Sequence, residues 1–493
     1  MKKRSVLAMA LASAMVFSMT ACGGSGSTAS EAPAADSGSS APTEAAASAA
    51  PESSATDEAS AASETSEASA AGEDAIPENE ISGDPSKADS FVVWAWNTDF
   101  VTLEDLLVQK YPELKDRLVF VNCGGSNYYQ DKIDALLNDP SNELYPDMML
   151  LEVGYVQKYV QSDYLMSLSD LGITDADVKD QFEYNIALGS DANGVQKASF
   201  WQATPGCIQV RADLAEEYLG TTDQAELEKT FSSWDSILEA AKKVNDASGG
   251  KVKLFSGYDD LKYIYLNGAR KVGWYDDNDV IQMDDAMAEY MDYAKELYDQ
   301  DLTFNTTMWG TDWAALKDGD GENSEACIAF AGCPWYTYWC LTDTWDKNTI
   351  LVDAPVQFYW GGTGLAATAE CSDKDVAAEI IKACTCDAEF MTDIYKANGD
   401  FVNNQSAIKD IVANDVKGTS TFSLYGDQNI PEFFSTRGQG VDVSLVKAED
   451  MTINESLFPA AVTSYATGEV DKDTAIKNFK DSVHDTYSYL KVE

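Results

Sequence analysis

Three short apolar runs, separated by segments with a helical pattern, constrain the fold of this chain most strongly. SFVVWAW (90–96), LVFVN (118–122) and PDMMLLE (146–152) are rich in β-branched and aromatic residues, which is typical of buried strands. TLEDLLVQKY (102–111) and YYQDKIDALLN (128–138) lie between them and repeat apolar residues at helical spacing. Strands that alternate with helices predict an α/β fold whose parallel strands are joined by right-handed crossovers.

Local patterns also place helix ends and helix faces. Thr102 followed by Asp105 has the form of a capping box, so we expect the first helix to begin at Thr102. The segments 233–244 and 284–298 each carry one apolar face and are expected to pack against a core. The residues expected on these faces are Trp234, Ile237, Leu238 and Ala241 in the first, and Met287, Met291, Ala294 and Tyr298 in the second.

Aromatic and polar side chains stand at the ends of the first and third strands, and Cys123 to Ser126 follow the second. Trp96 and Asn97 close the first strand, and Glu152 ends the third with Tyr155 just beyond it. Parallel sheets bind ligands beyond the carboxyl ends of their strands, so we expect these four side chains to line a ligand site. Alternate residues of a strand lie on the same face, so Trp94 and Trp96 could instead both be buried in the core. This alternative is stronger for Trp94.

The first residues resemble a bacterial lipoprotein signal. A basic start (2–4) precedes an apolar run (6–21) that is too short for a membrane-spanning helix. Met19-Thr20-Ala21-Cys22 is similar to the lipobox, in which cleavage before the cysteine leaves a lipid on its sulfur. We therefore expect a signal peptide at 1–21 and a lipid on Cys22 that holds the chain at the outer face of a bacterial membrane. A plain signal peptide cut elsewhere is the alternative.

Residues 22–89 have the composition of a flexible tether. Nearly all of them are Ala, Ser, Glu, Asp, Gly, Thr or Pro, with hardly a large apolar side chain. Such a segment buries too little apolar area to offset the entropy lost on ordering, so we expect disorder over 22–89. The folded body is then expected from residue 90, and its length favours two lobes over one compact core.

Charge narrows the possible partners. The chain has 83 acidic and 34 basic residues, a formal net charge of −49. Nucleic acid and anionic lipid surfaces would be repelled, so neither is expected as a partner. DGDGEN (318–323) lacks a glycine at the sixth position, where an EF-hand loop has one, and is more typical of a surface turn than of a calcium site.

The cysteines and the single histidine disfavour metal and triad chemistry. The chain has nine cysteines and one histidine, His484. The eight cysteines after Cys22 permit disulfides in an exported chain, but their spacing leaves the pairing open. Cys384 and Cys386, two apart in an expected helix, face different directions. We expect no zinc site, no Ser-His or Cys-His catalysis and no cofactor.

Four segments of the body resemble one family of proteins. They are 146–172, 197–220 with its R-x-D-L element, 331–339 with Pro334-Trp335, and 358–407 with its long returning helix. In this order and spacing they resemble the extracellular solute-binding proteins of bacterial carbohydrate ABC importers, the maltose-binding-protein-like family 1. The resemblance covers the chain from about residue 90 to its end.

The resemblance implies a periplasmic-binding-protein-like fold of two α/β lobes. It places the first lobe at 90–200 and 359–415 and the second at 205–356 and 416–493. Crossing hinge strands would join the lobes, and a sugar would be held where they close. Tyr and Trp are abundant, at 24 and 11 residues, and flat rings stack well on the apolar C–H faces of sugars.

The resemblance also implies which residues contact the sugar. It puts Trp335 at a stacking position, Glu152 at a hydroxyl-binding carboxylate, and Trp201 with Gln202 on a crossing segment. Trp360, Gly361 and Gly362 fall on the return crossing, where glycine lets backbone approach a ligand closely. Four further aromatic residues favour core or lobe-surface positions instead: Trp309, Trp313, Tyr336 and Trp339.

The function implied is capture of a sugar or oligosaccharide outside the cell and its delivery to ABC transporter permease subunits. The protein would be a monomer and not an enzyme. A cell-surface glycoside hydrolase is one alternative, because aromatic residues and carboxylates also describe its cleft. Hydrolysis needs two carboxyl groups flanking the bond, and Glu152 stands alone at the strand ends. A surface adhesin is the other alternative.

Overall fold

The computed structural model describes residues 79–341, 344–418 and 422–493. The expected signal peptide, Cys22 and most of the expected tether lie outside the described residues. Within these three ranges, none of the helices combines the length and the apolar character needed to span a bilayer.

A six-stranded mixed sheet forms the centre of the N-terminal part of the fold. Its strand order is β1-β3-β2-β4-β11-β5, with β2 parallel to β3 and to β4 and with β11 antiparallel to β4. These strands are β1 (Glu80–Ser82), β2 (Phe91–Ala95), β3 (Leu118–Asn122), β4 (Met148–Glu152), β5 (Ser199–Phe200) and β11 (Thr363–Ala367). The three apolar runs of the sequence are therefore parallel neighbours, as expected.

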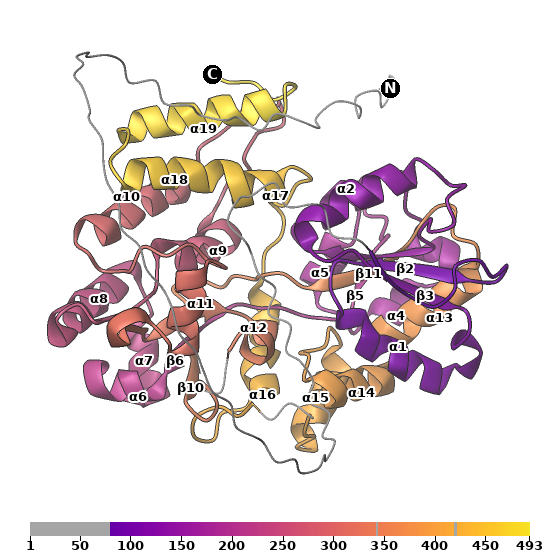
Figure 1. Cartoon of the computed structure of the whole chain (residues 1–493), viewed down its shortest axis with the longest axis horizontal. Helices are drawn as coiled ribbons and strands as arrows, with labels where there is room; N and C mark the ends of the chain where they lie inside the picture. Colours follow the sequence, from indigo (N-terminus) through magenta and orange to yellow (C-terminus); the bar gives the residue numbers. More distant parts are fainter. Residues whose placement is uncertain (1–78, 342–343, 419–421) are drawn as a thin grey trace, which may run out of the picture. The chain divides into compact units, whose positions relative to one another are not determined.

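The order in which the chain adds strands to the sheet reverses at β2. The chain adds β3 on one side of β2 and then β4 on the other, so α1 (Asp99–Lys110) and α2 (Ser126–Leu137) cover opposite faces (Figure 1). The carboxyl ends of β2 and β4 flank this switch point, where open α/β sheets bind ligands. Trp96 and Glu152 are the residues at those two ends.

Helix α1 begins three residues before the expected start, so the capping-box prediction at Thr102 is wrong. Thr98 is its N-cap residue and makes no side-chain capping bond. The extra turn buries Phe100 completely, and its ring stacks on Phe120 with 5.7 Å between centroids. Burial of an aromatic side chain outweighs a local cap, which is worth about 1 kcal/mol.

The structure corrects the end of the predicted tether. Residues 80–82 form β1, which pairs antiparallel with β3 from Glu80↔Asn122 to Ser82↔Phe120. The exposed hydrogen-bonding edge of β3 accounts for this pairing, because an edge strand is a template for any nearby extended segment. Order therefore begins before residue 90.

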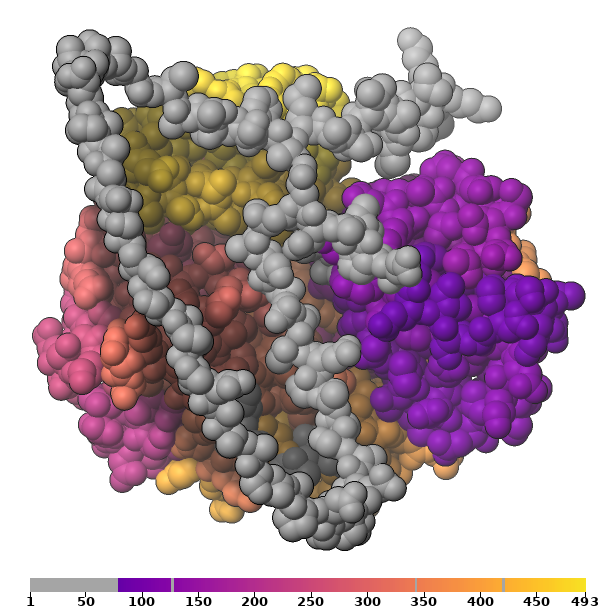
Figure 2. Space-filling model, in the orientation of Figure 1, coloured from indigo at the N-terminus to yellow at the C-terminus, as the bar shows by residue number. Residues whose placement is uncertain are grey.

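A second, smaller sheet and a set of helices form the other part of the fold. Its antiparallel order is β10-β6-β9, and β7 pairs with β8 separately. The strands are β6 (Cys207–Arg211), β7 (Val252–Lys253), β8 (Ala326–Cys327), β9 (Ala329–Gly332) and β10 (Thr349–Val352). Helices α10 (Asp285–Asp299), α18 (Phe458–Ala466) and α19 (Lys472–Thr486) pack in succession (Figure 1), and the C-terminal helices form the yellow surface of Figure 2.

The expected helix faces are largely as observed. Helix α8 (Trp234–Ser248) buries Ile237 and Ala241, and α10 buries Met287, Met291 and Ala294. Tyr298 is the exception: it is 36% exposed, while Leu297 is buried. The last turn of α10 therefore presents Leu297 to the core, and the Tyr298 side chain remains at the surface.

The other α-helices are mostly short. They are α3 (Val156–Val160), α4 (Asp175–Val178), α5 (Glu183–Leu188), α6 (Ala212–Leu214), α7 (Gln224–Thr230), α9 (Lys262–Ile264), α11 (Thr311–Asp318), α12 (Pro334–Trp339), α13 (Lys374–Thr385), α14 (Ala388–Asn398), α15 (Gln405–Ala413), α16 (Ile430–Ser435) and α17 (Asp450–Thr452). Cys386 follows the end of α13, and all eight cysteines of the described residues are free thiols.

Buried residues form two hydrophobic cores. The chain passes from the first core to the second between Cys207 and Ile208, returns over 358–365, and crosses again after Phe434. Helix α16 packs in the first core, where Phe434 lies 5.8 Å from Phe401 between ring centroids, although the expected boundary at 415/416 would give it to the second lobe. The division into two lobes otherwise remains a prediction.

Candidate functional site

The carboxyl ends of β2 and β4 bring Trp96, Tyr155 and the carboxylate of Glu152 to one region. The half-buried ring of Trp96 packs edge-on against Tyr129 and Tyr155, with centroids 5.6 and 5.9 Å apart. Asn97 uses its Oδ1 to accept the backbone N–H of Asp99 at 3.2 Å. Trp94, in contrast, lies in the core, so strand alternation does not bury Trp96 with it.

Four aromatic side chains form what we call the aromatic wall. Tyr263, Trp335 and Trp360 belong to the second core or pack against it, and Trp309 stacks on Trp335 from outside that core. Trp360 stacks on Tyr263 with 4.5 Å between centroids and meets Trp335 at 4.9 Å. The indole N–H of Trp335 donates to the carbonyl of Trp360 at 3.0 Å. Trp309 is 41% exposed and Trp335 is half-buried, so these two rings offer surface to solvent, whereas Trp360 is buried behind them at 6% exposed.

Gly361 brings Glu152 and the aromatic wall together. A Cβ atom at Gly361 would lie 3.1 Å from Trp335 Nε1 and 3.5 Å from Glu152 Oε1. Its φ of +65°, and that of +110° at Gly362, are conformations that favour glycine. Val153 N–H donates to the carbonyl of Gly362 at 3.0 Å, which fixes this turn against the end of β4.

Glu152 is a half-buried carboxylate with one oxygen engaged. Its Oε2 accepts the backbone N–H of Gly154 at 2.7 Å, and no described residue bonds to Oε1 or forms an ion pair with it. Burial raises the pKa of Glu152 to about 7, and the nearby charge of Glu455 adds to the shift. Both effects disfavour the ionised form.

Glu455 is held by two neighbours from the short helix α9. Tyr263 donates its hydroxyl to Glu455 Oε1 at 2.8 Å, and Lys262 donates to Oε2 at 2.9 Å. Lys262 also lies 3.9 Å from Asp259. Sequence reasoning missed Lys262, Tyr263 and Glu455, because no local motif links residues so far apart in the chain.

Trp201 and Gln202 are not brought to the aromatic wall. Trp201 is fully buried, and its indole N–H donates to Asp400 Oδ2 at 3.2 Å. Gln202 donates to Asp400 Oδ1 at 3.0 Å and accepts the N–H of Thr363 at 3.1 Å. With these polar atoms paired inside the protein, both side chains support the crossing segment and present no surface to a solute in this structure.

Trp313, Tyr336 and Trp339 occupy core or surface positions, as expected, but Tyr155, which was expected to line a ligand site, is buried instead. Trp313 and Tyr336 are buried, whereas Trp339 is 56% exposed. Tyr155 is also buried, and its hydroxyl has no hydrogen-bond partner among the described residues.

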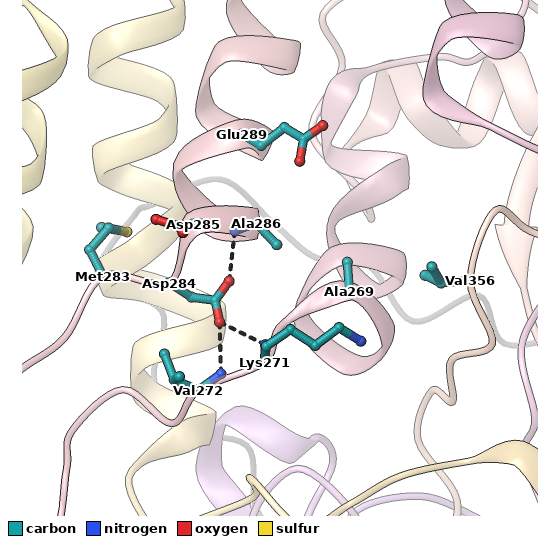
Figure 3. Close-up of a pocket in the computed structure, with 9 residues that line it drawn as sticks. All are labelled: Ala269, Lys271, Val272, Met283, Asp284, Asp285, Ala286, Glu289 and Val356. Atoms are coloured by element: carbon teal, nitrogen blue, oxygen red, sulfur yellow. Dashed lines mark hydrogen bonds between the residues drawn. The ribbon is translucent and has the colours of Figure 1, made fainter.

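Two surface hollows lie apart from these residues. The first, of about 500 Å³, is lined by side chains around the start of α10 (Figure 3). There the carboxylate of Asp284 accepts backbone N–H groups of Lys271, Val272 and Ala286, at 2.6–2.7 Å, and so caps the helix. The second hollow, of about 360 Å³, is lined by 353–357 and by Arg437. None of the predicted site residues lines either hollow.

The described residues contain no group of three or more His, Cys, Asp or Glu side chains arranged to hold a metal ion. The segment 318–323 begins at the last residue of α11 and runs into a short helical turn at Glu322–Ser324.

Pro334 positions Trp335 for its place in the wall. Pro at the first position of α12 has the φ that a helix needs, and the preceding Cys333 is extended. Trp335 therefore projects from the first turn of a six-residue helix that directly follows β9.

Deprotonation of Glu152 should lower the stability of the fold. Its folded pKa of about 7 lies above its ordinary value of 4.5, so the energetic cost is absent below about pH 4.5, grows as pH rises and is complete above pH 7. Glu152→Gln, neutral at every pH, should therefore be more stable than the wild type at pH 8, with the difference shrinking toward pH 5. Urea unfolding at the two pH values measures this, and a difference that does not depend on pH would contradict it.

Comparison with known proteins gives a family and a fold. A family model described as "Bacterial extracellular solute-binding protein" matches residues 107–419. A comparison with curated proteins gave no match.

Several solved structures have the same fold. An "Extracellular solute-binding protein family 1" is 16% identical, with a TM-score of 0.67 over 82% of this chain and 100% of that one. An ABC transporter associated binding protein from B. animalis subsp. lactis, in complex with beta-1,6-galactobiose, is 15% identical, with a TM-score of 0.63 over 83% and 100%. The sugar-binding protein MalE from Xanthomonas citri is 12% identical, with a TM-score of 0.62 over 81% and 97%.

Proposed function

Because the chain belongs to the bacterial extracellular solute-binding protein family, we propose that it captures a sugar or oligosaccharide and delivers it to an ABC transporter permease. The solute would lie against the aromatic wall and Glu152. The observation that carries this proposal is the turn at Gly361, where the Trp335 indole and the free oxygen of Glu152 both approach one glycine.

The chemistry of the aromatic wall and of Glu152 suits a sugar. A pyranose has apolar C–H faces that pack on flat rings, and hydroxyls that need acceptors and donors. The wall supplies the rings, and Glu152 Oε1 supplies an acceptor without a partner among the described residues. One solved neighbour of the same fold is described in complex with beta-1,6-galactobiose and another as a sugar-binding protein, which supports the same class of solute here.

Solute binding would draw the two cores together. Glu152 belongs to β4 of the first sheet and the wall to the second core, so a sugar that contacts both favours the closed form by its differential affinity. The first two crossing segments are already paired, because Gly206 N–H donates to the carbonyl of Phe358 at 2.7 Å. We propose these segments as the hinge and a monomer as the working unit.

A thermal-shift screen against mono- and oligosaccharides tests the proposed function. We expect at least one sugar to raise the melting temperature and to be recovered intact after incubation. Shortened oligosaccharides in the recovered material would assign the protein to the glycoside hydrolases instead. The absence of any shift across the screen, at millimolar sugar, would contradict sugar binding.

The family indicates an extracellular or periplasmic location, and we propose that a lipid on Cys22 anchors the chain at the outer face of the cell membrane. Cys22→Ser should remove the acylated sulfur, so we expect the variant to appear in the culture medium. Cell fractionation with immunoblotting measures the distribution, and the free thiol Cys340→Ser variant serves as a control that stays with the membrane. Membrane-bound Cys22→Ser protein would contradict the lipid anchor.

A further inference from the structure

Carboxylates outnumber basic groups around Tyr263. Burial raises the pKa of Tyr263, and the charges of Glu455, Glu152 and Asp259 act on its hydroxyl in the same direction. Lys262 is the base that pairs with two of these carboxylates, at 2.9 Å from Glu455 and 3.9 Å from Asp259. Glu152 is thus left without a cation among the described residues.

The other groups that face Glu152 do not supply a positive charge. Tyr155, from the turn after β4, is buried, and its hydroxyl has no hydrogen-bond partner among the residues that the structure describes. This hydroxyl interacts with the charge of Glu152. Tyr359, on the crossing segment, also interacts with Glu152, but the neighbouring Arg270 is bound to Asp450 at 2.6 Å. A half-buried carboxylate and an unpartnered buried hydroxyl therefore occur together.

We propose that the solute carries a cationic amino group, as in an amino sugar, and that this group binds the free Oε1 of Glu152 beside the aromatic wall. This inference rests on the proposed function and adds that the sugar is positively charged. An ammonium has three N–H donors, pairs with a carboxylate more strongly than a hydroxyl does, and is attracted by aromatic ring faces. Acidic sugars would be excluded by Glu152 and Glu455.

Proton linkage follows from the same geometry. A cation beside Glu152 lowers the pKa of that carboxyl from about 7 toward its ordinary value, so binding below pH 7 releases a proton. Affinity for an amino sugar should consequently rise with pH from 5 to 7.5, by up to about tenfold per unit for one proton. A neutral sugar should show a much smaller dependence.

Calorimetric titration with sets of sugars that differ at one group tests the inference. The probes are glucosamine, galactosamine and mannosamine, each with its neutral hexose and the matching uronic acid. Within at least one set we expect the amine to bind about 10–100-fold more tightly than the neutral sugar and the uronate not to bind. Titration at pH 6 in two buffers of different ionisation enthalpy should show proton release for the amine.

Variants of two glutamates test whether Glu152 is the residue that causes the preference for the amine. Glu152→Gln should reduce the preference for the amine to less than about threefold. Glu143→Gln, which changes an exposed glutamate in the loop that precedes β4, should leave that preference unchanged. Neutral sugars that bind as tightly as the amines, or an amine preference that survives Glu152→Gln, would overturn this inference and leave the proposed function standing. Failure of every sugar to bind would overturn both.

Discussion

Replacement of Trp335 by alanine is expected to weaken sugar binding by about 30-fold or more, the cost of removing a central aromatic contact of about 2 kcal/mol. Trp335 is half-buried, and part of its ring surface is free for a ligand. Its truncation also removes the N–H bond to the carbonyl of Trp360. Because the ring is only partly buried, we expect the melting temperature to fall less than it does for a core tryptophan.

Trp339 provides a matched control on the same helix. It is four residues farther along, 56% exposed, and packs less closely than Trp335. Trp339→Ala should leave both affinity and melting temperature nearly unchanged. Calorimetric titration and a thermal melt on the two variants distinguish a solute contact from a structural core residue. Intact affinity with a much lower melting temperature in Trp335→Ala would show that Trp335 is a core residue.

Replacement of Trp201 by alanine is expected to destabilise the fold by about 3–5 kcal/mol, as for other fully buried large side chains. The side chain is 0% exposed and lies in the first core. The variant also removes a donor from Asp400, a buried carboxyl whose pKa is raised by burial and lowered in part by this hydrogen bond. Urea unfolding measures the loss.

Trp201→Phe separates the contribution of the buried side-chain volume from that of the hydrogen bond to Asp400. Phenylalanine keeps most of the buried volume and removes the N–H, so its loss of stability should be distinctly smaller than that of alanine. Near-normal stability of Trp201→Ala together with lost sugar affinity would show instead that Trp201 contacts the solute.

The parallel strands could be predicted from the sequence because their pattern is local. Three runs of buried β-branched and aromatic residues, each followed by a helix, coincide with β2, β3 and β4 within two residues. The capping box at Thr102 failed for a tertiary reason, since burial of Phe100 extended the helix. The strand at 80–82 was missed because its pairing with β3, and not its own composition, orders it.

The candidate site was only partly predictable, because its parts depend on contacts between distant residues. Trp335, Trp360, Gly361 and Glu152 do meet around one turn. Trp201 resembled a ligand contact, but its partner Asp400 is 199 residues away and holds it in the core. Glu455 and Tyr263 are separated by 192 residues, so their hydrogen bond left no sequence signal.

Fluorine NMR on protein labelled with 5-fluorotryptophan tests most directly whether the sugar lies on the aromatic wall. The chain has 11 tryptophans, and single Trp→Phe variants assign their resonances. On saturation with a sugar from the screen, we predict that the Trp335 and Trp360 resonances shift and that the resonance of the fully buried Trp345 stays in place. Binding that leaves Trp335 and Trp360 unshifted would contradict the account.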